Sequence, residues 1–312
     1  MEGRNPGRSP KESTHGRDHG TDRPSHQQES GQRLPDRRVR GRRRPRRRVG
    51  TAWTPSCSTS ASSEKVSDVE AVRTSGTILV RPEDIAAAKG VVLGEATSLP
   101  GLHGFLSEFA DDYDCSAFVA IWAYQELQHH FGFRAWLRAV GVHVDQAKIE
   151  ALREPYEPGV TPSATLATNV ISEITVNTVY RAMAAWVQEP VLADLYLRAS
   201  RDEAGHAREF LHYLRRRLAT HPEELPSVLE RIHFYVTSSR LSHPVGVYKH
   251  QRVEELRGHE TVDDVIDLYL RISPPDAQDK LLAKLRRAIG SAIGVPLRST
   301  GDIRRALAAS LD

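Results

Sequence analysis

The sequence has little cysteine, few aromatic residues and no long apolar segment. Among 312 residues there are only 2 cysteines, Cys57 and Cys115, which cannot form a disulfide framework and suit a reducing compartment. No apolar run approaches the roughly 20 residues that cross a bilayer, and the arginine run Arg37–Arg48 precedes no apolar signal-peptide core. Alternating strand patterns and glycine-rich nucleotide loops are also missing. We therefore expect an all-α, cytoplasmic protein without a membrane span.

Charge is distributed unevenly along the chain. Residues 1–63 contain 15 Lys/Arg and 6 Asp/Glu, whereas residues 64–312 contain 28 and 34. Residues 1–78 are also rich in Gly, Pro, Ser and His, so they bury too little apolar surface to offset the entropy of ordering, and we expect a disordered basic tail. The cluster Arg42–Arg48 is either an arm for nucleic acid or anionic lipid, or a solvated tail, which is the simpler interpretation.

Beyond the tail, apolar residues recur at spacings of three, four and seven, which predicts helices. Pro82, followed by two acids, is typical of a first helical turn. We expect a four-helix bundle over 79–220 and a helical C-terminal extension over 221–312. The predicted helices run from Pro82 toward Phe109 with a kink at Pro100, from Cys115 to Val140, from Ser163 to Val187 and from Val191 to Leu218, with shorter ones at 222–239, 261–271 and 276–290.

Two Glu-x-x-His strings lie midway along predicted helices. Residues three apart share a helix face, so Glu126 with His129, and Glu203 with His206, each direct a carboxylate and an imidazole to one point. Both pairs fall on apolar stripes. Because a charge on a core face is costly unless it is paired or bound to metal, the strings indicate a metal site.

The string alone is weak, since it occurs five times, beginning at Glu12, Glu126, Glu203, Glu209 and Glu230. A di-iron bundle needs one further Glu from each of the two other helices. Glu95 precedes Glu126 by 31 residues and Glu173 precedes Glu203 by 30, as an antiparallel hairpin requires. Four carboxylates and two imidazoles suit iron or manganese. The predicted ligands of two iron ions are Glu95, Glu126, His129, Glu173, Glu203 and His206.

Several alternatives remain open at this point. The six residues could be salt-bridged core polar groups, and Glu108 is the rival of Glu95. Asp202 either accepts a hydrogen bond from a ligand histidine or forms a surface salt bridge with Arg198 or Arg201. His130 is expected to point away from the core stripe into solvent.

Four segments resemble the soluble acyl-carrier-protein desaturases, a branch of the ferritin-like di-iron oxidases. They are Glu95–Pro100, Trp122–His129, Ile171–Glu173 and Arg201–His206. The resemblance covers about 95–215 and implies that the six residues bind iron and that Asp202 is a hydrogen-bonding partner behind a ligand. Val176 stands where the family usually has a threonine, and residues 220–312 match poorly.

The resemblance also implies an activity and its partners. Dioxygen would be a co-substrate, an acyl chain on acyl carrier protein the substrate, a ferredoxin-type protein the electron donor, and the enzyme a homodimer. The carrier could dock on Arg134 and Arg138 or on Arg215–Arg217, although solvated faces are the simpler interpretation. Possible channel walls, more simply core residues, are Val119, Trp122, Phe133, Val176, Val179 and Met183.

Two other functions fit the same residues. One is a hydroxylase or N-oxygenase of a small molecule or tRNA, although Ala199 stands where an additional histidine would favour an N-oxygenase. The other is a non-catalytic ferritin-like protein that stores metal or binds a partner.

Overall fold

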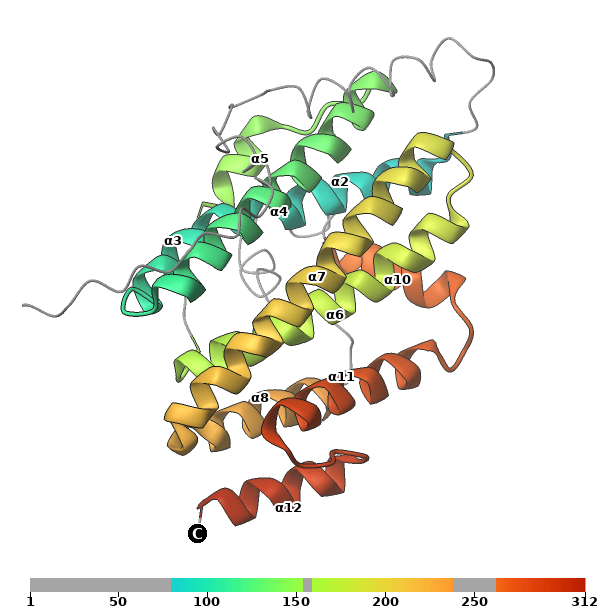
Figure 1. The fold of residues 1–312 in the computed structure, drawn as a ribbon. Helices are drawn as coiled ribbons and strands as arrows, with labels where there is room; N and C mark the ends of the chain where they lie inside the picture. The colour runs from blue at the N-terminus through green and yellow to red at the C-terminus, as the bar shows by residue number, and fades with distance from the viewer. Residues whose placement is uncertain (1–79, 154–158, 238–261, 312) are drawn as a thin grey trace, which may run out of the picture. The chain divides into compact units, whose positions relative to one another are not determined.

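The computed structural model describes residues 80–153, 159–237 and 262–311, and every regular element in these ranges is helical (Figure 1). This confirms the all-α prediction for the described ranges. They all belong to one compact unit of the chain, Ser56–Asp312; the predicted tail of residues 1–78 lies outside them. The elements are α2 Pro82–Ala96, α3 Ser98–Glu108, α4 Tyr113–Ala139, α5 Gln146–Ala151, α6 Pro162–Trp186, α7 Pro190–Thr220, a 3₁₀ turn η1 Pro222–Glu224, α8 Leu225–Thr237, α10 Val262–Ile272, α11 Ala277–Ile293 and α12 Thr300–Leu311.

The long helices begin and end where local chemistry favours it. The side chains of Asp112, Thr161 and Glu189 accept hydrogen bonds from backbone N–H groups at the start of α4, α6 and α7 respectively. Proline occupies the first turn of α2, α6 and α7, where its missing N–H costs nothing. After α4, Gly141 takes a positive φ of 85°, which terminates the helix. These signals explain why the predicted boundaries of the long helices lie close to the observed ones.

The first predicted helix divides at Thr97, three residues before the expected kink at Pro100. A proline ring excludes the carbonyl four residues before it, so α2 ends instead of bending. Beside the break, the carbonyls of Gly94 and Glu95 accept hydrogen bonds from the hydroxyls of Thr97 and Ser98, both at 2.7 Å. The break therefore lies directly beside Glu95.

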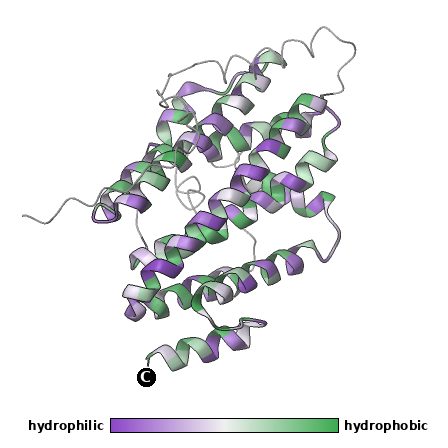
Figure 2. Cartoon of the chain, viewed as in Figure 1, coloured by the Kyte–Doolittle hydropathy of each residue, from purple (hydrophilic) through white to green (hydrophobic). Residues whose placement is uncertain are grey.

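The helices α6 and α7 are joined by a short turn and lie side by side along their length (Figure 1). Helix α4 packs on α2, α3 and α7, and the C-terminal helices α8, α10 and α11 all pack on α6. Helix α12 covers α8. Figure 2 shows hydrophobic and hydrophilic residues interleaved along the long helices, as amphipathic packing requires. Because several neighbours cover α6, its buried residues include many small polar side chains as well as apolar ones.

The start of α7 is tied to α4 by a buried hydrogen bond. The indole N–H of Trp136 donates to Glu189 Oε2 at 2.7 Å, and the same oxygen accepts the backbone N–H of Leu192 at 2.6 Å. Glu189 is buried, so leaving its partners unmatched would be costly. This contact fixes the height of α7 against α4.

Two helices, α5 and α12, were not predicted from the sequence. Helix α5 has six residues and none is buried. In α12 only Ile303 is buried. Helix α5 therefore lacks a buried apolar stripe, and that of α12 is short, with Ile303 buried and Ala306 and Leu307 partly buried. No helix in the described ranges is sufficiently long and apolar to span a membrane.

Glu224 joins the C-terminal end of α7 to the start of α6, and this yields a pH prediction. Its carboxylate accepts hydrogen bonds from Arg217 at 2.6 and 2.8 Å and from the Ser163 backbone N–H at 3.0 Å. Burial works to raise the pKa of Glu224, but Arg217 and Ser163 lower it to about 2. Because the folded-state pKa is depressed, this carboxylate stabilises the fold above its unfolded pKa of 4.5, and the contribution disappears as pH falls toward 2.

We expect Glu224→Gln to lower the free energy of unfolding by about 1–3 kcal/mol at neutral pH. The difference from wild type should shrink as the pH falls from about 4.5 to about 2. Urea unfolding across this pH range measures it. The exposed neighbour Glu223 provides the control Glu223→Gln, which should change little. A deficit of Glu224→Gln that is independent of pH would contradict the ion-pair assignment.

Candidate metal centre

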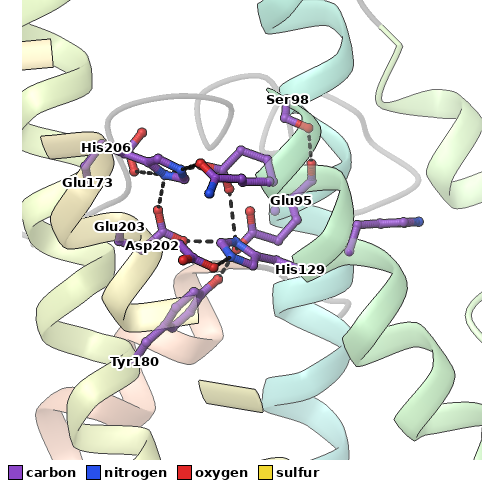
Figure 3. A network of polar contacts seen from close by, with 12 residues as sticks. Glu95, Ser98, His129, Glu173, Tyr180, Asp202, Glu203 and His206 are labelled. Atoms are coloured by element: carbon purple, nitrogen blue, oxygen red, sulfur yellow. Dashed lines mark hydrogen bonds and ion pairs between the residues drawn. The ribbon is translucent and has the colours of Figure 1, made fainter. Parts of the chain in front are cut away.

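Six buried polar side chains converge between α2, α4, α6 and α7 (Figure 3). None exceeds 8% relative exposure. They are the six residues that the sequence predicts as ligands, and we call them the carboxylate–histidine cluster: Glu95, Glu126, His129, Glu173, Glu203 and His206.

The cluster consists of two overlapping groups of possible ligand atoms. One group is Glu95, Glu126, His129 and Glu203, and the other is Glu126, Glu173, Glu203 and His206; within each group the atoms lie within 4.8 Å of one another. Each group could hold a metal ion. Both groups share Glu126 and Glu203, which gives a Glu95–His129 half and a Glu173–His206 half.

The shared carboxylates lie between the two imidazoles. His129 Nδ1 is 3.4 Å from Glu126 Oε2, 3.2 Å from Glu203 Oε1 and 4.0 Å from Glu95 Oε1. The other histidine, His206, has Nδ1 at 3.0 Å from Glu126 Oε1 and 2.9 Å from Glu203 Oε2. Each shared carboxylate therefore directs one oxygen toward each half.

The outer nitrogens of the histidines face different partners. His129 Nε2 is 3.1 Å from Asp202 Oδ2, and His206 Nε2 is 2.9 Å from Gln125 Oε1. These contacts orient both rings so that Nδ1 faces the carboxylates. The hydrogen-bonding alternative for Asp202 is thus the observed one, while Arg198 pairs with Asp194.

The two unshared carboxylates each accept one hydrogen bond from a neutral donor. The Tyr180 hydroxyl donates to Glu95 Oε1, and the Trp122 indole N–H donates to Glu173 Oε1 at 3.1 Å. Figure 3 shows the tyrosine directed at the cluster from below the histidines. These donors fix the direction of each carboxylate without adding charge.

Two cluster atoms indicate that a cation fits here. His129 Nδ1 and Glu203 Oε1 are buried and have no hydrogen-bond partner in the described structure, although they lie 3.2 Å apart. Unpartnered buried polar atoms are rare and costly. A cation between the carboxylates would engage both atoms, and two divalent cations would balance the charge of four carboxylates.

Burial and mutual charge shift the protonation equilibria of the cluster. Burial, together with the charge of Glu126, raises the pKa of Glu95 and of Glu173 well above the usual range. Burial opposes ionisation of Glu126 as well, but His206 and His129 hold its pKa well below that range. The pKa of each histidine is raised despite burial, because Glu203 lies beside His129 and Glu126 beside His206. Protons and cations therefore compete for the same atoms.

The rival residues lie away from the cluster. Glu108 accepts a hydrogen bond from the Thr165 hydroxyl at 2.9 Å. Glu209 pairs with Arg208 on the surface, and Glu230 is exposed. Glu12 lies outside the described residues.

The prediction that His130 faces solvent is wrong. Its side chain is buried, and Nδ1 lies 2.8 Å from the backbone carbonyl oxygen of Val92. Helix α2 packs on α4, so α4 has a second covered face that a single apolar stripe does not reveal. Burial lowers the pKa of His130, in keeping with a neutral imidazole that donates to this carbonyl.

The predicted docking arginines are largely engaged in intramolecular contacts. Arg216 pairs with Asp112, and Arg217 with Glu224. Arg134 donates to Gln146. The charges of Arg216 and Arg217 are therefore partly neutralised, whereas the amide of Gln146 leaves that of Arg134 in place.

The cluster is bordered by a cavity on one side and a groove on another. The cavity has a volume of about 50 Å³ and is lined by the four carboxylates together with Trp122, Val176, Tyr180 and the polar residues Thr97, Ser98, Asn169 and Ser172. The groove, of about 750 Å³, runs between α4 and α7, and Gln125, Asp202 and His206 line part of it.

Sequence reasoning missed Gln125 and Tyr180 as neighbours of the cluster and treated Trp122 only as an apolar residue. A signal for Gln125 was present, because Gln125 and Asp202 occupy the same position, directly before the Glu of a Glu-x-x-His string. The partners of Glu95 and Glu173 lie on other helices, and spacing along one helix does not reveal them.

The shared carboxylates should be essential for cation binding. Saturating Mn²⁺, at about 100 times its Kd, should stabilise the wild-type fold by about 2.7 kcal/mol, seen as a rise in Tm. Glu203→Ala should abolish the rise, because Glu203 serves both halves. Glu209→Ala is the matched control on the same helix and should keep it. An equal Mn²⁺ response in both variants would contradict the site.

Cation affinity should fall as the medium becomes more acidic. The raised pKa values of Glu95, Glu173 and both histidines mean that protons must leave before a cation binds. We expect Mn²⁺ affinity to decrease from about pH 8 to about pH 6. Calorimetry in buffers of different ionisation enthalpy counts the released protons. Binding without proton release would show that these atoms are not the ligands.

The donor atoms and their arrangement are what support a metal centre. Two groups of buried carboxylates and imidazoles, sharing two members, could each hold one cation. No family model, no curated protein and no solved structure matches this chain, so the assignment of the site rests on this geometry and chemistry.

Proposed function

We propose that α2, α4, α6 and α7 form a ferritin-like four-helix bundle around two iron ions, and that the protein is an oxygen-dependent di-iron oxidase. The observation that carries the proposal is the pair of overlapping ligand groups that share Glu126 and Glu203. A bundle that supplies Glu from two helices and Glu-x-x-His from the other two is the arrangement of di-iron carboxylate proteins. The helices after residue 220 would form an extension of this bundle.

The donor set favours iron or manganese over other metals. Carboxylate oxygens and imidazole nitrogens are hard and borderline donors, which suit these ions better than copper(I) or an iron–sulfur cluster. No described cysteine belongs to either ligand group. Iron bound here would supply the electrons that activate dioxygen for oxidation of an unactivated C–H bond.

The surrounding residues have defined tasks in such a site. Asp202 and Gln125 hold the imidazoles with Nδ1 inward, and Tyr180 and Trp122 hold the unshared carboxylates. Burial of the cluster limits access of water, which strengthens electrostatic interactions within it. The chain thus orients the cluster and limits its contact with bulk water.

The activity we propose is that of an acyl-carrier-protein desaturase. The resemblance of four short segments around the ligands supports it. The reaction would take two hydrogens from neighbouring carbons of a carrier-bound acyl chain; it consumes dioxygen, two electrons and two protons and yields two waters. A ferredoxin-type protein would supply the electrons, and a homodimer would be the working form.

The cavity beside the cluster favours a second candidate, a hydroxylase or N-oxygenase of a small molecule. A volume of about 50 Å³ holds only a few water-sized molecules. Thr97, Ser98, Asn169 and Ser172 give it a polar lining. Of the residues considered as channel walls, only Trp122 and Val176 line this cavity; Val119, Phe133, Val179 and Met183 are buried core residues.

Oxygen uptake and product mass distinguish these functions. We expect the iron-loaded, chemically reduced protein to consume dioxygen, and Glu203→Ala to consume none. Mass spectrometry of acyl-carrier protein after the reaction should show loss of two hydrogens from the acyl chain. An unchanged acyl chain, together with gain of one oxygen atom by an added small molecule, would favour the second candidate. Iron binding without oxygen uptake would contradict both and indicate a non-catalytic metal-binding protein.

A further inference from the structure

A similar five-residue pattern on α4 and α7 places a polar residue next to the outer nitrogen, Nε2, of each histidine. We call this residue the backing residue of that histidine. The pattern runs from Gln125 to His129 on α4 and from Asp202 to His206 on α7. In both, the residue before the shared glutamate reaches across to the histidine of the other helix. Gln125 Oε1 lies 2.9 Å from His206 Nε2, and Asp202 Oδ2 lies 3.1 Å from His129 Nε2.

These two backing residues differ in charge. An imidazole that binds a cation through Nδ1 carries its proton on Nε2 and donates it outward. Asp202 accepts this hydrogen bond with a carboxylate oxygen, whereas Gln125 accepts it with a neutral amide oxygen. The charge-assisted hydrogen bond is the stronger, and a carboxylate behind the ring raises the basicity of the ligand nitrogen. His129 is therefore the better donor of the two.

The α4–α7 groove borders one of the two imidazoles. His206 lines the α4–α7 groove, and His129 is not among the residues that line it. Both imidazole side chains are nevertheless only 3% exposed, so burial does not separate the two halves. The side chain of Asp202 is 39% exposed, so solvent moderates but does not remove its effect.

The four carboxylates of the cluster contribute little to a difference in cation affinity between the two halves. Glu126 and Glu203 serve both halves. Glu95 and Glu173 each accept one hydrogen bond from a neutral aromatic side chain. The main chemical asymmetry of the cluster is thus a carboxylate in one backing position and an amide in the other.

We propose that the two halves hold divalent cations unequally, the Glu95–His129 half more tightly than the Glu173–His206 half. Asp202 and Gln125 are the positioning residues that set the difference. The proposal rests on the two-metal site proposed above. It implies that the ion beside His206 is the first to dissociate.

Two variants that should change affinity in opposite directions test this in the full-length chain. Each is first freed of metal and then titrated with Mn²⁺, and binding is followed by calorimetry and electron paramagnetic resonance. Repulsion between two bound cations separates the binding steps even for equal halves, so the variants are compared with wild type. Asp202→Asn makes both backing residues amides and should weaken the first, tighter step about 10-fold. Gln125→Glu makes both carboxylates and should tighten the second step about 10-fold.

Gln128→Glu is the matched control. Gln128 lies on α4 like Gln125, is hydrogen-bonded to Tyr124 and lies outside both ligand groups. The substitution Gln128→Glu therefore adds the same charge as Gln125→Glu without backing a histidine. It should leave the separation of the two steps unchanged. Thermal unfolding of each metal-free variant checks the fold, and if Gln125→Glu does not fold, Asp202→Asn alone decides.

Three results would overturn the inference: a second step weakened by Asp202→Asn, two steps unaffected by either variant, or an effect of Gln128→Glu equal to that of Gln125→Glu. Each of these leaves the two-metal site intact. Failure of the wild-type chain to bind two ions would instead overturn the proposed function.

Discussion

The burial of four carboxylates around two imidazoles is the constraint on which the rest of the structure depends. Like charges in a buried site repel one another, and their separation from solvent carries an additional cost. Hydrogen bonds around the cluster hold it in place. The Trp136–Glu189 bond fixes the position of α7 along α4, and neutral donors orient the carboxylates of Glu95 and Glu173. A protein that required only a stable core would fill this space with apolar side chains. The arrangement is therefore better explained by ligand binding than by stability.

The C-terminal helices contribute to this support from outside the cluster. Helices α8, α10 and α11 pack on α6, which carries Glu173. Lys284 of α11 donates to Asn177 of α6 at 2.9 Å, and Asn177 donates to the Ser200 carbonyl of α7 at 2.6 Å. This contact chain crosses from α11 through α6 to α7 near Glu203. Residues beyond the four ligand-bearing helices thus help to hold the site in place.

The long helices and the residues of the cluster could be predicted because both follow from local spacing. Capping residues and prolines mark the helix starts, and the offsets between Glu95 and Glu126 and between Glu173 and Glu203 follow from hairpin geometry. What could not be predicted depends on contacts between helices. Burial of His130 requires knowing that α2 covers a second face of α4, and the contact of Tyr180 with Glu95 joins residues 85 positions apart. The helix break at Thr97 lay within reach of the sequence, because the proline four residues after Ala96 excludes its carbonyl.

The cavity and the groove reach the cluster through different residues. The cavity meets the carboxylates, including Glu95 and Glu173, while the groove meets the backing residues and the outer edge of His206. His206 faces the groove-lining Gln125 through Nε2 and the cavity-lining Glu126 and Glu203 through Nδ1. One imidazole ring therefore links the residues that line the two spaces.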